Sequence, residues 1–233
     1  MGIREPRQVR FKVDAVTFDD FGTLRFSVSQ EDIIYPILRV LSGNLRLDEE
    51  KFLDEYFRMD AYYRKKLKET LRESLLDDII IECLKSLCFK SQTIENIVRR
   101  AVDRGLATRR TKWYGDALFV LSTLRKRGYK LGLISNTHWR YLKSFRKEVE
   151  RVFDVITLSY EHGYAKPHPS IFLATLEKLQ VNPNRCLHMG DDPIADIEGA
   201  KNVGMKAAFI KRGDFKARAD INIRKLTQLL EIL

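Results

Sequence analysis

Short apolar runs recur along the chain and are separated by segments with a different periodicity. The first run, residues 13–18, is rich in β-branched and aromatic side chains and ends at two carboxylates, Asp19 and Asp20, which precede a Gly-Thr turn. Similar runs occupy residues 129–134, 152–158, 186–189 and 205–210. Runs of this length that end at polar or glycine residues predict buried strands.

Segments with apolar residues three and four positions apart lie between these strands. They occupy residues 116–127, 139–150, 169–179 and 194–203, and a short strand and a closing helix follow in the tail. Gly128 and Gly204 stand where two of these helices are expected to end. Strands that alternate with helices predict an α/β fold with a parallel sheet covered on both faces.

A long block with helical periodicity alone interrupts this alternation after the first strand. Its predicted helices occupy residues 30–41, 48–71, 74–89 and 93–104, with start signals at Ser29, Asp48 and Ser91. We therefore predict two domains, an α/β core of residues 1–24 and 113–233 and an inserted all-helical domain of residues 25–112.

Composition and charge narrow the class of protein. Apolar residues make up 44% of the 233 positions, which is enough for a large buried core. The net charge is +10, but Lys and Arg are scattered among 32 acidic residues, and this scatter favours a charged surface over a nucleic-acid-binding one.

The cysteines and the apolar runs bear on the cellular compartment. Three cysteines do not form a disulfide framework, and we expect all three to be buried as small apolar side chains. Charges interrupt the longest apolar runs, so no segment is expected to span a membrane. The N-terminus lacks the apolar core of a signal peptide. We therefore expect a soluble, cytoplasmic protein.

Polar side chains follow several of the predicted strands. Asp19 follows the first strand, Ser135 and Asn136 follow the second, Lys166 lies in a later loop, and Asp191 ends another strand. In open α/β sheets ligands bind beyond the carboxyl ends of the strands. The order of these residues therefore predicts one polar site at that edge of the sheet.

Four segments resemble the motifs of a known family. In order and approximate spacing, FDDFGTL, LISN, AKPHPSIF and HMGDDPIADIEGAKNVGM are similar to the four motifs of the haloacid dehalogenase (HAD) superfamily of hydrolases. The resemblance covers nearly the whole chain, with the helical insert in the position of that superfamily's cap. It implies a Rossmann-like core, a mobile helical cap at residues 25–112 and chemistry through an aspartyl-enzyme intermediate.

The resemblance also implies a role for each matching residue. Asp19 is the nucleophile, Ser135 with Asn136 beside it binds the transferring group, and Lys166 offsets negative charge at the nucleophile. Asp19, Asp191 and the backbone carbonyl of Phe21 would hold Mg²⁺. A carboxylate that attacks phosphorus needs both its own charge and that of the phosphoryl oxygens neutralised, which a lysine and a hard cation achieve.

The first motif departs from the pattern of the superfamily's phosphatases. Those enzymes usually carry an Asp two residues after the nucleophile, which protonates the leaving alcohol, and Phe21 occupies that position here. The superfamily's 2-haloacid dehalogenases carry a Tyr there and use no metal. This motif therefore favours a dehalogenase, unless the proton comes from Asp20, from a cap residue or is not needed by a good leaving group.

The last motif favours a phosphatase, because it keeps Asp191, Asp192 and Asp196, and acids near a carboxylate nucleophile repel one another without a cation. We therefore favour Mg²⁺-dependent hydrolysis of small phosphate esters through a phosphate on Asp19. The alternatives are a metal-independent 2-haloacid dehalogenase that uses Asp19, and a non-catalytic protein that binds phosphorylated ligands. The substrate and the oligomeric state stay open.

Overall fold

The computed structural model describes residues 11–28, 33–71, 75–108, 110–211 and 217–233. The described residues form two compact units. The first is an α/β unit, drawn from Met1–Phe26, Trp113–Leu158 and Lys166–Leu233; the second is a helical unit, drawn from Ser27–Lys112 and Ser159–Ala165. The predicted core and cap domains, 1–24 with 113–233 and 25–112, stay a prediction.

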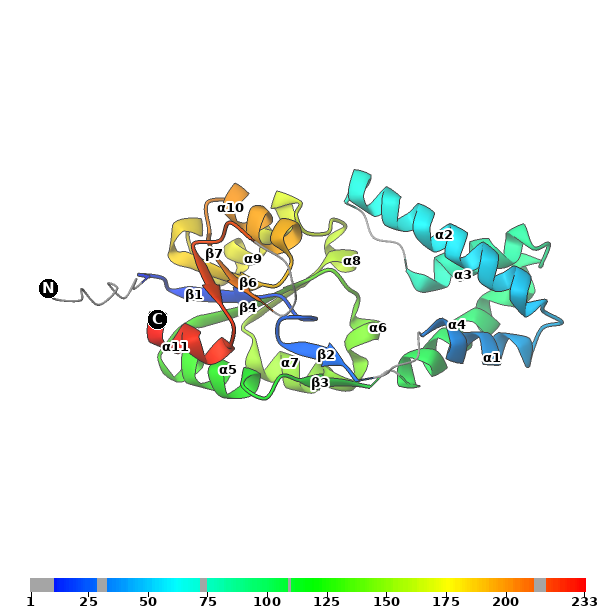
Figure 1. The fold of residues 1–233 in the computed structure, drawn as a ribbon, viewed down its shortest axis with the longest axis horizontal. Helices are drawn as coiled ribbons and strands as arrows, with labels where there is room; N and C mark the ends of the chain where they lie inside the picture. Colours follow the sequence, from blue (N-terminus) through cyan, green and yellow to red (C-terminus); the bar gives the residue numbers. More distant parts are fainter. Residues whose placement is uncertain (1–10, 29–32, 72–74, 109, 212–216) are drawn as a thin grey trace, which may run out of the picture. The chain divides into compact units, whose positions relative to one another are not determined.

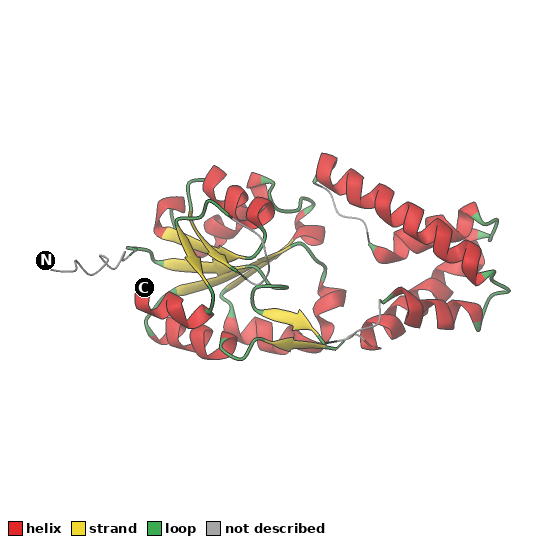
Figure 2. Cartoon of the chain, in the orientation of Figure 1, coloured by secondary structure: helices red, strands yellow, loops and turns green. Residues whose placement is uncertain are grey.

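A six-stranded parallel sheet forms the centre of the α/β unit (Figures 1 and 2). Its strands are β1 (Ala15–Phe18), β4 (Lys130–Ser135), β5 (Val155–Leu158), β6 (Cys186–Gly190), β7 (Lys206–Ile210) and β8 (Ile221–Ile223). Every neighbouring pair in the order β5-β4-β1-β6-β7-β8 is parallel. The predicted α/β fold with a parallel sheet is confirmed.

The strand order places β1 at the point where the chain changes sides. From β1 the chain continues to β4 and β5 on one side, and it then crosses to β6, β7 and β8 on the other. Such a reversal opens a crevice at the carboxyl ends of the strands, where ligands bind in open α/β sheets. The residues that follow β1, β4 and β6 therefore converge on one crevice.

Helices cover both faces of the sheet, as predicted (Figure 1). The helices on one face are α5 (Ala117–Lys126), α7 (Arg146–Val152) and α11 (Leu229–Ile232), and those on the other are α9 (Pro169–Leu179) and α10 (Gly199–Asn202). Successive side chains of β1 alternate between the two apolar cores, because Val16 and Phe18 belong to the first and Ala15 to the second.

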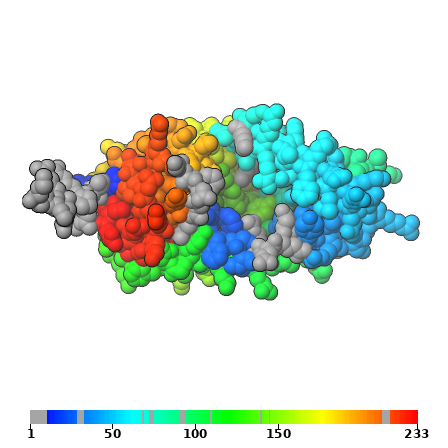
Figure 3. Space-filling view, viewed as in Figure 1, coloured from blue at the N-terminus to red at the C-terminus, as the bar shows by residue number. Residues whose placement is uncertain are grey.

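The C-terminal segment completes the first of these cores. In the space-filling view this segment, red, lies beside the segment that contains α5, green (Figure 3). The Arg127 guanidinium donates to the carbonyl of Leu230 at 2.7 Å, and the Tyr129 hydroxyl donates to that of Leu233 at 2.9 Å. Helix α11 is thereby fixed to the end of α5.

The helical unit has an apolar core of its own. Its helices are α1 (Ile34–Ser42), α2 (Glu49–Thr70), α3 (Leu76–Ser86), α4 (Ser91–Thr108) and α8 (Ser159–His162). Fully buried side chains in this core include Ile37, Leu41, Phe52, Ile80, Leu84 and Val98. The predicted start signal at Asp48 is confirmed, because its side chain accepts from the Lys51 amide; α4 begins at Ser91, two residues earlier than predicted, and Ser29 lies outside the described residues.

Three local features differ from the sequence prediction. The helix predicted at 139–150 is α6 (Trp139–Leu142), a 3₁₀ turn and α7, and α7 extends to Val152, so that β5 begins three residues later than expected. The helix predicted at 194–203 begins as a π-helix, Pro193–Glu198, and continues as α10. A small second sheet of β2 (Arg25–Ser27) and β3 (Thr111–Trp113) was not predicted, because three residues are too few to show alternation.

The cysteines only partly follow the expectation. Cys83 and Cys186 are buried, and burial raises the pKa of each thiol to about 12. Cys88 is exposed, which corrects the expectation for that residue, because it lies beyond the end of α3 with a φ of 68°. No helix in the described part of the chain has both the length and the apolar character needed to cross a membrane.

Candidate active site

Asp19 lies at the carboxyl end of β1, in the crevice defined by the strand order. Its amide donates to the carbonyl of Met189 at 2.8 Å, which extends the pairing of β1 with β6 by one residue, and its side chain is largely buried. It borders a cavity of about 230 Å³. The cavity is lined by Asp19, Phe21, Ser135, Asn136, Lys166, Asp191, Asp192, Ala195 and Asp196. The structure therefore brings all the predicted site residues together.

Lys166 is the cation of the site. Its Nζ donates to Asp19 Oδ1 and to Asp196 Oδ1, both at 2.6 Å, and its side chain is buried. Burial alone would lower the pKa of Lys166, but the two carboxylates outweigh burial and raise it above its usual value. Lys166 therefore stays protonated beside the predicted nucleophile.

Asn136 holds the backbone of Lys166. Its side-chain oxygen accepts from the Lys166 amide at 2.7 Å, and its side-chain nitrogen donates to the Lys166 carbonyl at 3.0 Å. The side-chain amide is thus used on both sides to position Lys166. Ser135, at the end of β4, and Asn136 both border the cavity, and their predicted contact with phosphate stays a prediction.

Asp196 organises the last motif around Lys166. Its Oδ1 accepts from Lys166, and its Oδ2 accepts from the amides of Asp191 at 3.1 Å and Asp192 at 3.0 Å. Burial opposes the charge of this carboxylate, but Lys166 and His188 together outweigh burial, so the pKa of Asp196 lies below its usual range. Asp196 lies in the π-helix, a form of helix that occurs frequently at functional sites.

Asp191 borders the cavity beside the first motif. Its Oδ1 accepts from the Thr23 hydroxyl at 3.1 Å, and burial, together with the charge of Asp196, raises its pKa to about 6. A Cβ atom on Gly22 would overlap the Asp191 carboxylate, and Gly22 also has a φ of 97°. Only glycine therefore fits at the turn after the first strand.

The three carboxylates suit a divalent cation. One oxygen from each of Asp19, Asp191 and Asp196 lies within 4.8 Å of the other two. Asp19 Oδ2 is buried and has no hydrogen-bond partner among the described residues. Burial, with Asp196 and Asp191 acting in the same direction, raises the pKa of Asp19 to about 8 despite Lys166. A cation at this oxygen would give Asp19 Oδ2 a partner and would favour the charged form of Asp19. Hard oxygen ligands are those that Mg²⁺ prefers.

The Asp20 carboxylate is paired with Arg25 and does not line the cavity. Its carboxylate pairs with the Arg25 guanidinium through two hydrogen bonds, one of 2.6 Å between Arg25 Nε and Asp20 Oδ1 and a second from Arg25 Nη2 to Asp20 Oδ2, and both side chains are buried. Asp20 is not among the residues that line the cavity. The pairing with Arg25 therefore does not favour Asp20 as the source of the missing proton, and that suggestion stays a prediction.

Phe21 occupies the rim of the cavity. Its side chain is 45% exposed, and it has no group that can transfer a proton. The remaining carboxyl of the lining, Asp192, is exposed, and its Oδ1 accepts from the amides of Ile194 and Ala195, both at 2.8 Å. Asp192 is thus the cap of the π-helix.

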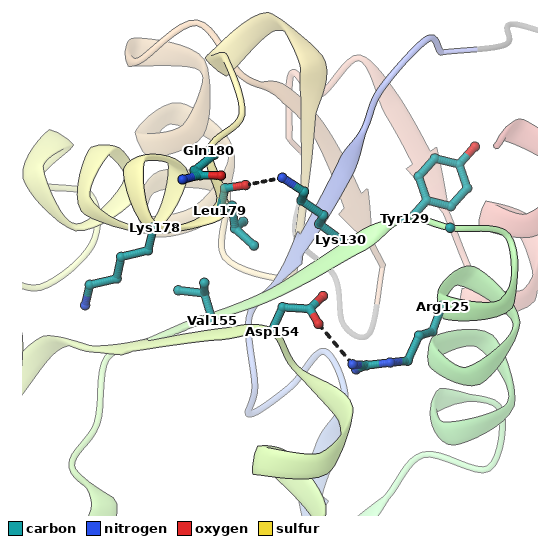
Figure 4. A pocket seen from close by; sticks show the side chains of 9 residues that line it. Arg125, Tyr129, Lys130, Asp154, Val155, Lys178, Leu179 and Gln180 are labelled. Carbon is teal, nitrogen blue, oxygen red and sulfur yellow. Dashed lines mark hydrogen bonds and ion pairs between the residues drawn. The ribbon is translucent and has the colours of Figure 1, made fainter.

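A larger hollow of about 430 Å³ lies at the opposite end of β4, near the start of β5 (Figure 4). Its charged side chains hold the ends of neighbouring elements. Lys130 donates to the carbonyl of Leu179 at 2.7 Å, and Arg125 pairs with Asp154 at 3.0 Å and donates to the carbonyl of Val152 at 2.6 Å. This hollow has no activated nucleophile, so the smaller cavity at Asp19 is the candidate active site.

Solved structures share this fold over nearly the whole chain. A 2-haloacid dehalogenase from Pseudomonas syringae pv. Tomato DC3000 superposes with a TM-score of 0.72 at 23% identity, covering 94% of this chain and 97% of that one. A HAD phosphatase from Thermococcus onnurineus superposes with a TM-score of 0.64 at 28% identity, with the same coverage of both chains. The likeness to the dehalogenase, at this identity, shows the fold alone.

Curated relatives with phosphatase names match part of the chain. Glyceraldehyde 3-phosphate phosphatase of Pyrococcus furiosus is 38% identical over 123 residues, which are 49% of this chain and 51% of the relative. Phosphoglycolate phosphatase of Aquifex aeolicus is 33% identical over 117 residues, which are 48% of this chain and 53% of the relative. The chain thus spans about half the length of the curated relatives it matches.

A family comparison covers more of the chain. The model of the haloacid dehalogenase-like hydrolases matches residues 13–204, a range that includes Asp19, Ser135, Lys166 and Asp191. This range is far more than half of the chain, and it contains the residues that the structure gathers around the cavity. The resemblance in the motifs is therefore confirmed, and the chain belongs to the haloacid dehalogenase-like hydrolases.

Proposed function

We propose that this chain is a Mg²⁺-dependent phosphatase that hydrolyses small phosphate monoesters through a covalent phosphate on Asp19. The observation that carries the proposal is the cluster of carboxylate oxygens from Asp19, Asp191 and Asp196 at a residue, Asp19, whose Oδ2 is buried without a hydrogen-bond partner among the described residues. A dehalogenase that expels halide needs no metal, and two acids beside its nucleophile would only oppose the charge of the nucleophile. The phosphatase names of the partial relatives support the same substrate class.

The residues of the chain have separate tasks in this reaction. A carboxylate oxygen of Asp19 attacks phosphorus, and the bond from phosphorus to the ester oxygen breaks as the new bond forms. Water then attacks phosphorus, which releases inorganic phosphate and restores the Asp19 carboxylate. The covalent intermediate divides one difficult hydrolysis into two easier steps. Lys166 offsets charge at Asp19, and the Ser135 hydroxyl donates a hydrogen bond to the transferring group.

The metal would be held by Asp19 and Asp191, with the Phe21 carbonyl as the third protein ligand. Both oxygens of Asp196 already accept hydrogen bonds, so Asp196 acts by positioning Lys166 and the amides of Asp191 and Asp192. When bound, Mg²⁺ supplies positive charge against the phosphoryl oxygens and the nucleophile.

Protonation of the leaving group limits the choice of substrate. Phe21 cannot donate a proton, and Asp20 is committed to Arg25. Esters whose alcohol has a low pKa leave without general acid catalysis. We therefore expect activated phosphate esters to react fastest.

A second candidate function is 2-haloacid dehalogenation. The aromatic Phe21 in the first motif favours it, because halide needs no proton when it leaves. In that reaction Asp19 would attack carbon rather than phosphorus, and the metal would have no task.

A panel of phosphate esters and 2-haloacids, assayed with Mg²⁺ and with EDTA, separates the two candidates. We expect phosphate release that requires Mg²⁺ and falls by several orders of magnitude in Asp19→Asn, since one carboxylate carries the covalent step. Halide release that is unchanged by EDTA, with no phosphate release under any condition, would instead establish the dehalogenase.

A further inference from the structure

A chain of buried hydrogen bonds leads from the interior of the sheet to Asp19. Thr17 and His188 lie opposite each other in the pairing of β1 with β6, and the Thr17 hydroxyl is 2.9 Å from His188 Nδ1. His188 Nε2 is 3.3 Å from Asp196 Oδ1, which accepts from Lys166, and Lys166 donates to Asp19. Neither Thr17 nor His188 touches the cavity.

The group that can only accept, the Asp196 carboxylate, determines the direction of the hydrogen bonds that His188 makes. The Asp196 carboxylate can only accept, so the hydrogen between the two side chains belongs to His188 Nε2. His188 is fully buried and lies near the Lys166 ammonium, and its imidazole is neutral because burial lowers its pKa. A neutral imidazole that carries its hydrogen on Nε2 accepts at Nδ1. The Thr17 hydroxyl therefore donates to Nδ1.

The opposite tautomer would weaken the site. With the hydrogen on Nδ1, the lone pair of Nε2 would face the negatively charged Asp196 oxygen. Repulsion between them would displace the oxygen that holds Lys166. The ring has little freedom to avoid this by turning, because it is fully buried and packs edge-to-face against Phe172 with 5.3 Å between ring centroids.

We propose that Thr17 and His188 are a positioning pair: by donating to Nδ1, the Thr17 hydroxyl stabilises the imidazole tautomer whose Nε2–H holds Asp196 against Lys166, and thereby helps to set Lys166 at the nucleophile. The inference rests on the proposed role of Asp19 in catalysis. It adds two residues that lie one and two hydrogen bonds behind Asp196. A histidine that merely filled the core would not depend on a particular tautomer.

Matched substitutions at Thr17 test the proposal through activity. Thr17→Val keeps the shape of the side chain and removes the donor, and we expect kcat to fall roughly tenfold to a hundredfold, as for the loss of a hydrogen bond in a charged network. Thr17→Ser restores the hydroxyl and should recover most of kcat. Likewise His188→Gln, whose amide can donate to Asp196, should retain more activity than His188→Leu.

A second buried hydroxyl pair in the same unit provides the control. The Thr175 hydroxyl donates to Thr157 Oγ1 at 2.8 Å, both side chains are buried, and neither lines the cavity. Thr157→Val should lower thermal stability about as much as Thr17→Val and leave kcat within twofold. Equal losses of kcat in Thr157→Val and Thr17→Val would overturn the proposal, and so would an unchanged kcat in Thr17→Val.

Nitrogen NMR of the imidazole tests the tautomer without reference to activity. Wild type and Thr17→Ser should show His188 protonated at Nε2 only, and Thr17→Val should shift the signals towards the other tautomer; His188→Gln assigns them among the 4 histidines. An imidazolium, or a hydrogen on Nδ1 in wild type, would overturn the inference. If wild type hydrolyses no ester, the proposed function fails, and the NMR result alone then decides the inference.

Discussion

The ion pair between Asp20 and Arg25 is buried, so removal of one of its two charges should lower the free energy of unfolding. The Arg25 side chain is 3% exposed and that of Asp20 is 5% exposed, and the guanidinium makes both hydrogen bonds to the carboxylate. It also lies 4.5 Å from the ring centroid of Phe145 and 5.7 Å from that of Trp113. Arg25→Met keeps a long apolar side chain but leaves the Asp20 carboxylate buried without its counter-ion.

The expected loss follows from this burial. Removal of one partner of a buried pair lowers the free energy of unfolding by about 3–5 kcal/mol. At about 2–4 °C per kcal/mol for a chain of this size, Tm should fall by roughly 6–20 °C. Asp20→Leu combined with Arg25→Met removes both charges, and it should recover part of this loss.

An exposed pair in the same unit is the matched control. Arg185 donates to Asp14 through Nε at 2.9 Å and Nη2 at 2.5 Å, so its geometry is similar, but its side chain is 41% exposed and that of Asp14 is 50% exposed. Arg185→Met should therefore change Tm much less than Arg25→Met. Thermal and urea unfolding followed by circular dichroism measure both variants. Equal losses in the two variants, or a double variant less stable than Arg25→Met, would refute the reasoning from burial.

Three further predictions concern catalysis, metal binding and thiol reactivity. Phe21→Asp should flatten the dependence of log kcat/KM on leaving-group pKa and speed alkyl esters by up to about 10²–10⁴-fold, as for a well-placed acid; an unchanged slope in the folded variant would mean that another residue already donates the proton. Asp191→Ala should raise the Mg²⁺ concentration for half-maximal activity by roughly tenfold or more, and an unchanged value would exclude Asp191 as a ligand. A thiol reagent at pH 8 should label Cys88 rapidly and the buried Cys83 and Cys186 slowly, because burial raises the pKa of the latter two; three fast thiols would contradict the fold.

The strand-end residues of the site were predictable from the sequence for a physical reason. A buried parallel strand is a short apolar run, and the residue after it lies at the ligand-binding edge, so Asp19, Ser135 and Asp191 follow from hydrophobicity alone. Lys166 does not, because it lies in a loop without a periodic pattern. Its place came from the resemblance in the third motif, and the structure sets it 2.6 Å from Asp19.

The contacts that support the site residues could not be predicted from the local sequence. Thr17 and His188 are 171 residues apart, and only the register of β1 with β6 brings them together. Asp20 and Arg25 are residue types that usually lie at the surface, and the rings packed around Arg25 decide their burial. The acids near Asp191 are visible in the sequence as a cluster, but the hydrogen bonds that both oxygens of Asp196 accept depend on the fold and could not be predicted.

The covalent phosphate on Asp19 is the central claim, and it can be trapped directly. The protein is mixed with Mg²⁺ and an activated phosphate ester, quenched in acid during turnover and reduced with borohydride, which converts an aspartyl phosphate to homoserine. We predict, by mass spectrometry of the peptide that contains residue 19, homoserine at that position in wild type and none in Asp19→Asn or without substrate. Rapid turnover with no homoserine at residue 19, or with homoserine at another aspartate, would contradict the account.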